Sequence, residues 1–124
     1  MSILFPTGRR IPARKFHEAA VRGRYEPNLR MIRGTIDTSG AGSILFGSGF
    51  TIVRNGVGDI TITFDPLFAA APSVLTTVET TVLGTGSHVD STVPPTVSAV
   101  RIQRYLGAVA SDGVFDFVAI GPIT

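Results

Sequence analysis

The sequence predicts an all-β protein: an antiparallel β-sandwich, jelly-roll-like in arrangement, that follows an extended basic N-terminal arm. Two observations predict this class. Short runs of β-branched and aromatic residues, separated by turn residues, recur about every eight to twelve positions. The 124 residues also include 14 Gly and 8 Pro but only 16% charged residues, a composition that suits short strands and many turns. A single domain of this length buries a core without disulfides.

The clearest element is a hairpin over residues 50–64. Its two strands, at 50–54 and 59–64, flank an Asn-Gly turn with a second glycine, Asn55-Gly56-Val57-Gly58. In the second strand, apolar residues alternate strictly with threonines, in the order Ile60, Thr61, Ile62, Thr63 and Phe64. Because strand side chains point to opposite faces in turn, one face of this hairpin is predicted to lie on the core.

The remaining strands are predicted at residues 29–37, 43–46, 73–83, 97–106 and 114–120. Alternation within 73–83 is imperfect, which indicates a bulge or an edge strand. Residues 67–72 form an apolar connection that is expected to cover one end of the core. Residues 84–96 are predicted as the longest loop and 107–113 as a turn. The last strand is apolar on both faces except at Asp116.

The charge is divided unevenly between the two parts of the chain. Residues 1–33, the predicted arm, carry a net charge of +6, and residues 34–124, the predicted sandwich domain, carry −4. Within the arm, residues 1–12 are predicted to be extended. Residues 13–22 are predicted to form a short helix, with Pro12 near its first turn and Gly23 past its end.

Two interpretations of the arm stay open: a flexible tail, or a segment that orders on a neighbouring subunit. Its apolar residues, among them Ile3, Leu4 and Ile11, favour the second because a solvated tail does not need them. Basic contacts to an acidic protein surface would add to such docking. The docking residues predicted on this basis are Phe5, Arg9, Arg10, Arg14, Lys15, Phe16, Arg22 and Arg24.

Composition argues against several classes of protein. The absence of Cys excludes disulfides and thiolate metal sites. No apolar run approaches the roughly 20 residues of a membrane helix, so membrane insertion is not expected. No apolar signal-peptide core follows the N-terminal Phe5, Pro6, Arg9 and Arg10, which favours synthesis and assembly in a cytoplasm.

The sequence predicts no enzymatic activity, metal or cofactor. Ser87, His88 and Asp90 are adjacent in sequence, whereas members of a catalytic triad normally converge from separate elements. The same His and Asp are too few to hold a metal ion. Carboxylate pairs for glycoside cleavage, Asp112 with Asp116 or Asp59 with Asp65, lie at strand and turn ends, where acids usually cap or face water. Nucleic-acid binding by the arm is disfavoured because it has no interleaved aromatic residues beyond Phe16 and Tyr25 and no folded groove-reading motif.

One segment is a candidate for ligand or receptor contact. The loop 84–96 carries His88 and Asp90, and the following strand adds Arg101, Arg104 and Tyr105. Loops on a rigid scaffold commonly carry binding residues, and Tyr and Arg commonly anchor interfaces. The alternative is a solvated loop tip whose neighbouring arginines pair with acids of the sandwich.

Four motifs lie within residues 33–121: Gly49-Phe50-Thr51, the strand that ends Thr63-Phe64-Asp65-Pro66, the Ala-Pro-x-Val of residues 71–74, and the Phe-x-Phe-x-Ala-Ile-Gly of residues 115–121. In this order they resemble a small β-sandwich module of bacteriophage virion proteins. These are strand and turn positions, so the resemblance transfers no catalytic residue. It implies a tail or head fibre or spike component, usually a homotrimer, concerned with attachment or decoration.

The function expected from these observations is that of a small trimeric tail-tip, fibre or spike component of a phage virion. Its arm would anchor it to other virion proteins, and its sandwich loops would face outward. The apolar residues on both faces of the last strand add a physical reason for oligomerisation. The alternatives are a capsid decoration protein and a lectin-like module that binds a host cell-surface glycan.

Overall fold

The computed structural model describes residues 2–4, 10–12 and 28–123. Within these ranges the protein is all-β and contains no helix, which confirms the predicted fold class. The strands are β1 (Ser2–Leu4), β2 (Arg10–Pro12), β3 (Leu29–Asp37), β4 (Ser43–Gly47), β5 (Phe50–Gly56), β6 (Asp59–Phe64), β7 (Ser73–Thr77), β8 (Thr85–Val89), β9 (Ala99–Leu106), β10 (Val109–Ala110) and β11 (Val114–Pro122). No helix long and apolar enough to cross a membrane occurs in the part of the chain that the structure describes.

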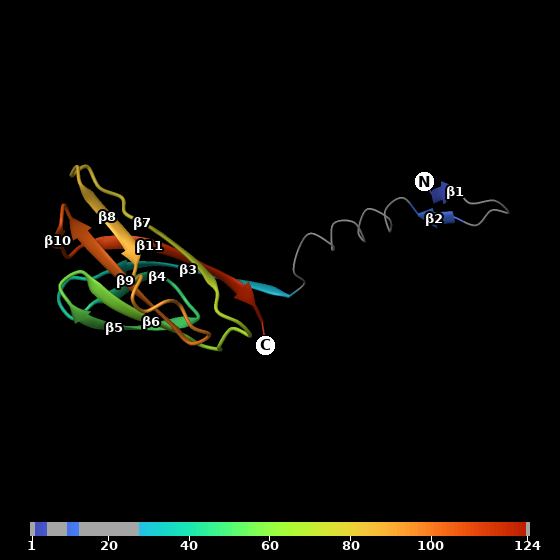
Figure 1. Cartoon of the computed structure of the whole chain (residues 1–124), viewed down its shortest axis with the longest axis horizontal. Coiled ribbons are helices and arrows are strands. Elements are labelled where there is room, and N and C mark those ends of the chain that lie inside the picture. Colours follow the sequence, from blue (N-terminus) through green and yellow to red (C-terminus); the bar gives the residue numbers. More distant parts are fainter. Residues whose placement is uncertain (1, 5–9, 13–27, 124) are drawn as a thin grey trace.

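The sandwich consists of two antiparallel sheets. Sheet I has the order β4-β3-β11-β7, and sheet II has β5, β6 and β9 in order, with β8 and β10 also paired to β9. Ile102 in β9 lies opposite both Ile60 in β6 and Val89 in β8, so β6 and β8 flank β9 on its two edges. Figure 1 shows β3 and β11 side by side in one layer and the green strands β5 and β6 in the other.

The core lies between the sheets and follows the alternation seen in the sequence. Ile60, Ile62 and Phe64 of β6 are buried, as are Val100 and Ile102 of β9. From sheet I, alternate residues of β3 and β11 point inward, namely Ile32, Ile36, Phe115, Phe117 and Ala119. The inward side of the hairpin was therefore predicted correctly from its period of two.

Aromatic contacts join the two layers and close one end. The rings of Phe50 in sheet II and Phe117 in sheet I meet edge to face, with centroids 5.0 Å apart. Phe68, from the connection after β6, is fully buried and meets Phe64 in the same geometry. Arg30 lies over the Phe68 ring and donates hydrogen bonds to the backbone carbonyls of Asp65 and Pro66. The prediction that residues 67–72 cover one end of the core is confirmed for Phe68.

The predicted hairpin turn is shifted by two residues. The turn itself is Val57–Gly58, and Asn55 lies within β5 at a register shift between Arg54 and Gly56. The Asn55 amide donates hydrogen bonds to Asp59 (3.1 Å) and Thr61 (2.8 Å) of the facing strand. These side-chain bonds keep Asn55 on the sheet, and the Asn-Gly pair does not form the turn.

The region from residue 73 to residue 96 differs most from its prediction. The predicted strand 73–83 ends at Thr77, because the chain then crosses from sheet I to sheet II. The predicted loop 84–96 begins with β8, an edge strand that pairs along β9 from Thr85 to Val89. Its Gly-Ser-rich sequence has low strand propensity, so pairing with β9 determines its conformation. The turn predicted at 107–113 also contains the short strand β10.

The N-terminal arm is described only in part. Within its predicted extended segment, β1 and β2 pair antiparallel, with Ile3 opposite Ile11. The helix predicted at residues 13–22 lies outside the described residues. β3 begins at Leu29, so residues 29–33, which the sequence assigned to the arm, belong to the sandwich.

The outer face of sheet I is largely apolar. The prediction that β11 is apolar on both faces is confirmed, because Val114, Val118 and Ile120 alternate with its buried residues. The pairing of Val118 with Leu75 and of Ile120 with Met31 extends this apolar surface over neighbouring strands. Leu75 is 71% exposed and Met31 64% exposed. We refer to this surface, formed by Leu29, Met31, Phe46, Leu75, Val114, Val118 and Ile120, as the apolar face.

Candidate functional site

The outer face of sheet II carries a continuous row of polar side chains. Alternate positions of four strands place them on the solvent side, opposite the core. We call this row the polar track, and it consists of Asn55 from β5, Asp59 and Thr61 from β6, His88 from β8, and Arg101, Gln103 and Tyr105 from β9.

Arg101 and its two acidic partners form the centre of the polar track. Its guanidinium donates to both carboxylate oxygens of Asp59, from Nε at 2.9 Å and from Nη2. Its Nη1 lies 3.4 Å from Oδ2 of Asp90. The hydrogen bond from Arg101 holds the pKa of Asp59 below its ordinary value. Hydrogen bonds from Thr92 lower the pKa of Asp90 in the same direction, with a further contribution from Arg101.

His88 and Tyr105 form one end of the track. His88 Nε2 lies 2.9 Å from Gln103 Oε1, a hydrogen bond in which the ring N–H donates. The His88 and Tyr105 rings lie with centroids 5.3 Å apart and are tilted by 40°. Tyr105 lies across β8 over Gly86, where a Cβ atom would overlap the phenol oxygen. The absence of a side chain at position 86 therefore leaves the space that the Tyr105 ring occupies.

Two depressions adjoin the track. A groove of about 420 Å³ lies beside the connection from β8 to β9, between Val93 and Pro94 on one side and Asn55, Thr61 and Arg101 on the other. A second hollow of about 230 Å³ is lined by Asp59 and, around the other end, by His88, Gln103 and Tyr105. Arg101 lines the groove and Asp59 lines the hollow, so their ion pair joins the two depressions. The track therefore runs from an apolar wall to an aromatic pair.

Arg104 does not belong to this face. It lies one residue out of phase with Arg101 and Tyr105, so its side chain points inward and is only 9% exposed. Its guanidinium donates to three backbone carbonyls, those of Ser111 (3.3 Å), Asp112 (2.7 Å) and Val114 (3.2 Å). Arg104 therefore holds the segment that leads into β11.

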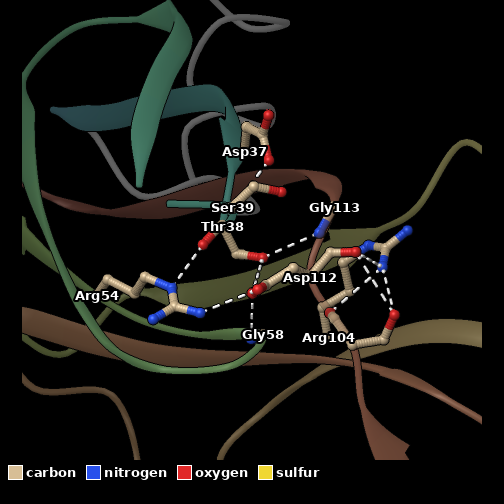
Figure 2. A network of polar contacts seen from close by, with 9 residues as sticks. Asp37, Thr38, Ser39, Arg54, Gly58, Arg104, Asp112 and Gly113 are labelled. Carbon is tan, nitrogen blue, oxygen red and sulfur yellow. Dashed lines mark hydrogen bonds and ion pairs between the residues drawn. The ribbon is translucent and has the colours of Figure 1, made fainter. Parts of the chain in front are cut away.

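Asp112 organises a polar network at the same end of the sandwich (Figure 2). Its carboxylate accepts hydrogen bonds from the Gly58 N–H (2.7 Å), the buried Thr38 hydroxyl (2.9 Å) and Arg54 Nη2 (2.9 Å). Arg54 also donates to the Thr38 carbonyl. The Gly58 N–H is the main cause that lowers the pKa of Asp112. Because these groups satisfy one another and connect the residue after β3, the β5–β6 hairpin and the segment before β11, the network is structural.

The structure separates the predicted contact residues into three groups. His88 and Tyr105 meet at one end of the polar track, Arg101 and Asp90 form an ion pair at its centre, and Arg104 lies inside the sandwich. The alternative in which the arginines pair with acids of the sandwich is confirmed for Arg101 and wrong for Arg104, which binds carbonyls. Of the predicted docking residues in the arm, only Arg10 lies in a described strand, β2. The others, Phe5, Arg9, Arg14, Lys15, Phe16, Arg22 and Arg24, lie outside the described residues.

Four residues of the track were not among the predicted contacts: Asn55, Asp59, Thr61 and Gln103. A signal for three of them was present, because period-two alternation places Asp59 and Thr61 on one face of β6 and Gln103 beside Arg101 on β9. Alternation did not indicate Asn55, because the Asn-Gly pair predicts a turn at this position and not a strand.

The two members of each carboxylate pair considered for glycoside cleavage have different surroundings. Asp112 lies in the inner network and Asp116 accepts from Thr35 in β3, while Asp59 binds Arg101 and Asp65 follows β6. Within residues 28–123 and the two short arm strands, no group of three or more His, Asp or Glu side chains gathers as metal ligands would.

Comparisons with known proteins do not assign the chain to a family. No protein family model matches the chain, and no curated protein or solved structure is significantly similar to it. The resemblance to phage virion modules therefore stays a prediction from the residues quoted above.

Proposed function

We propose that this protein is a small, non-enzymatic structural component of a bacteriophage virion, a tail-tip, fibre or spike subunit that assembles as a homotrimer. The N-terminal arm anchors it to other virion proteins, and the sandwich projects from the particle. The motif resemblance of residues 33–121 and the charge difference between arm and sandwich support this proposal.

The apolar face is the observation that carries the proposal. Leu75, Met31 and Phe46 are each more than half exposed, and they lie on one sheet with the half-buried Val118 and Ile120. Contiguous apolar surface of this kind marks a protein–protein contact. The same face also holds charges of both signs, Arg33 over the Phe46 ring and Asp116 on β11, as a self-associating surface needs.

A charge placed on the apolar face tests the assembly. We expect the full chain to have the mass of three chains in light scattering at micromolar concentration. Leu75→Glu should reduce this to one chain, because an unpaired carboxylate in an apolar contact is strongly unfavourable. Val53→Glu is the matched control, since Val53 is 59% exposed on the outer face of sheet II. A monomeric full chain, or equal effects of both variants, would contradict the proposal.

A capsid decoration protein is the second candidate, favoured by the same apolar face, which would then cover part of a shell. Copy number separates the two functions. A decoration protein is expected at tens to hundreds of copies per particle, whereas a tail-tip or fibre subunit is expected at only a few, and quantitative mass spectrometry of purified particles measures this.

A further inference from the structure

We propose that the polar track on the outer face of sheet II is a binding site for a neutral, linear oligosaccharide. The inference deepens the proposed attachment role and rests on it only for the source of the ligand, a glycan of the host surface. Binding itself requires only residues of the sandwich. The shape, chemistry, charge and rigidity of the track each support this assignment.

The shape of the track suits an elongated ligand. Arg101, Gln103 and Tyr105 occupy alternate positions of β9, so the first and last are separated by roughly 13 Å along the strand. The groove of about 420 Å³ and the hollow of about 230 Å³ adjoin the two ends of this row. Ligand pockets commonly have volumes of this order. Together they accommodate a short chain of ring units laid along β9.

The chemistry of the track suits a ligand that carries many hydroxyls and also apolar C–H surface. Asn55 and Gln103 supply amides that both donate and accept hydrogen bonds, the Asp59 carboxylate accepts them, and the Arg101 guanidinium donates them. Val93 and Pro94 provide an apolar wall at one end of the track. At the other end, the ring of Tyr105 combines a large apolar surface with a hydroxyl group. Sugar rings present this same combination of hydroxyls and apolar faces.

The charge of the track selects against acidic ligands. Arg101 is the only cationic side chain of the track within the described residues, and it already pairs with Asp59 and Asp90. Arg104 also borders the hollow, but it is only 9% exposed and its guanidinium donates to backbone carbonyls. One positive charge against two negative charges leaves the centre with a formal charge of −1. An anionic group placed there would meet repulsion at short range. Sialylated, sulfated and phosphorylated ligands are therefore disfavoured relative to neutral sugars.

The track is held rigid before any ligand arrives. Asn55 bonds to Asp59 and Thr61, Asp59 bonds to Arg101, and Gln103 bonds to His88. Gly86 leaves the space in which Tyr105 lies. Preorganised side chains lose little entropy on binding, which favours affinity for a small, flexible ligand.

Binding of the full chain to an array of immobilised neutral and acidic oligosaccharides tests the proposal. We expect retention on neutral glycans of three or more sugar units and weaker or no retention on their acidic counterparts. The best neutral oligosaccharide is then titrated into the full chain by calorimetry. An array without binding, or binding to acidic glycans alone, would overturn the proposal.

Variants locate the site. Tyr105→Ala and Gln103→Ala should each weaken binding about tenfold or more, because each removes part of the track. Gly86→Ala should weaken it as well, because the added methyl displaces Tyr105 while every ligand-facing side chain is retained. Thr51→Ala, an exposed change on β5 of the same sheet away from both depressions, is the control and should bind like the parent. Parental affinity in Tyr105→Ala and Gly86→Ala would place the ligand elsewhere.

The result of the glycan-binding test does not depend on the result of the light-scattering test of assembly. A chain that is trimeric but binds no glycan retains the proposed assembly and loses this inference. A chain that binds neutral glycans through Tyr105 but is monomeric retains this inference and loses the proposed assembly. Thermal unfolding of each variant shows that its fold is intact in either case.

Discussion

At the scale of single residues, Asp112 is the clearest structural determinant among the acidic residues. Three donors from three segments converge on one carboxylate, and one of them, Thr38, is fully buried. Removing an acceptor from such a site leaves buried donors without partners, which costs more than the net value of the hydrogen bonds themselves.

Asp112→Asn should lower the free energy of unfolding at neutral pH by about 1–2 kcal/mol, since its amide cannot accept all three bonds. The pKa of Asp112 is lowered in the folded state, so its contribution is complete above the unfolded value of about 3.8 and is lost as pH falls through the folded pKa. The loss of stability between about pH 6 and about pH 3 should therefore be smaller in the variant than in the parent. Urea unfolding at both pH values measures this.

Glu79→Gln is the matched control for that measurement, because Glu79 is exposed on the connection after β7. It should change the free energy of unfolding by no more than about 0.5 kcal/mol at either pH. An equal acid-induced loss of stability in the Asp112→Asn variant and the parent would show that the network does not depend on the ionised carboxylate.

At the scale of elements, the packing of β3 against β5 and β11 depends on one position without a side chain. Gly34 lies in the centre of β3, beneath the edge-to-face pair of Phe50 and Phe117. A Cβ atom there would lie 2.5 Å from Phe50 Cζ and 2.8 Å from Phe117 Cε1. A residue without a side chain at position 34 is therefore a packing requirement between the two sheets.

Gly34→Ala should destabilise the protein by about 1–3 kcal/mol, because both rings must leave their positions in a close-packed core. Gly56→Ala is the control, since a Cβ at Gly56 meets no atom within 4 Å. It should be neutral or slightly stabilising, because alanine restricts the unfolded chain. Chemical denaturation of both variants provides the comparison, and similar midpoints for the two would contradict this account of the core.

At the scale of the whole molecule, the sandwich presents two faces of opposite character. The outer face of sheet I is apolar and proposed to join subunits, and the outer face of sheet II is polar and proposed to bind a glycan. In this arrangement subunit assembly leaves the polar track accessible. The basic arm enters the sandwich at Leu29, the first residue of β3.

Deletion of residues 2–24 tests whether the arm anchors the protein to the particle. The buried core runs from Ile32 to Ala119, so the shortened chain should retain cooperative unfolding. It should lose incorporation into purified particles, detected by immunoblot, because the basic and apolar docking residues are gone. Normal incorporation of the shortened chain would show that the arm is not the anchor.

The sequence by itself determined the fold class, most strands and the inward face of the hairpin. Alternation in β6 identified Ile60, Ile62 and Phe64 as core residues, because a strand's side chains alternate with a period of two whatever its partners. The same alternation revealed the second apolar face of β11. Strand formation and side-chain alternation depend on residues that are neighbours in the sequence, so the sequence alone is enough to predict them.

Only the tertiary structure decided which strands pair and which polar residues meet. β8 is a strand because β9 supplies its hydrogen bonds, and Asn55 leaves the turn because Asp59 and Thr61 accept its amide. Arg101 binds Asp59, which lies 42 residues away, and Arg54 binds Asp112, which lies 58 residues away. The polar track depends on such pairing between strands, which no single stretch of sequence contains.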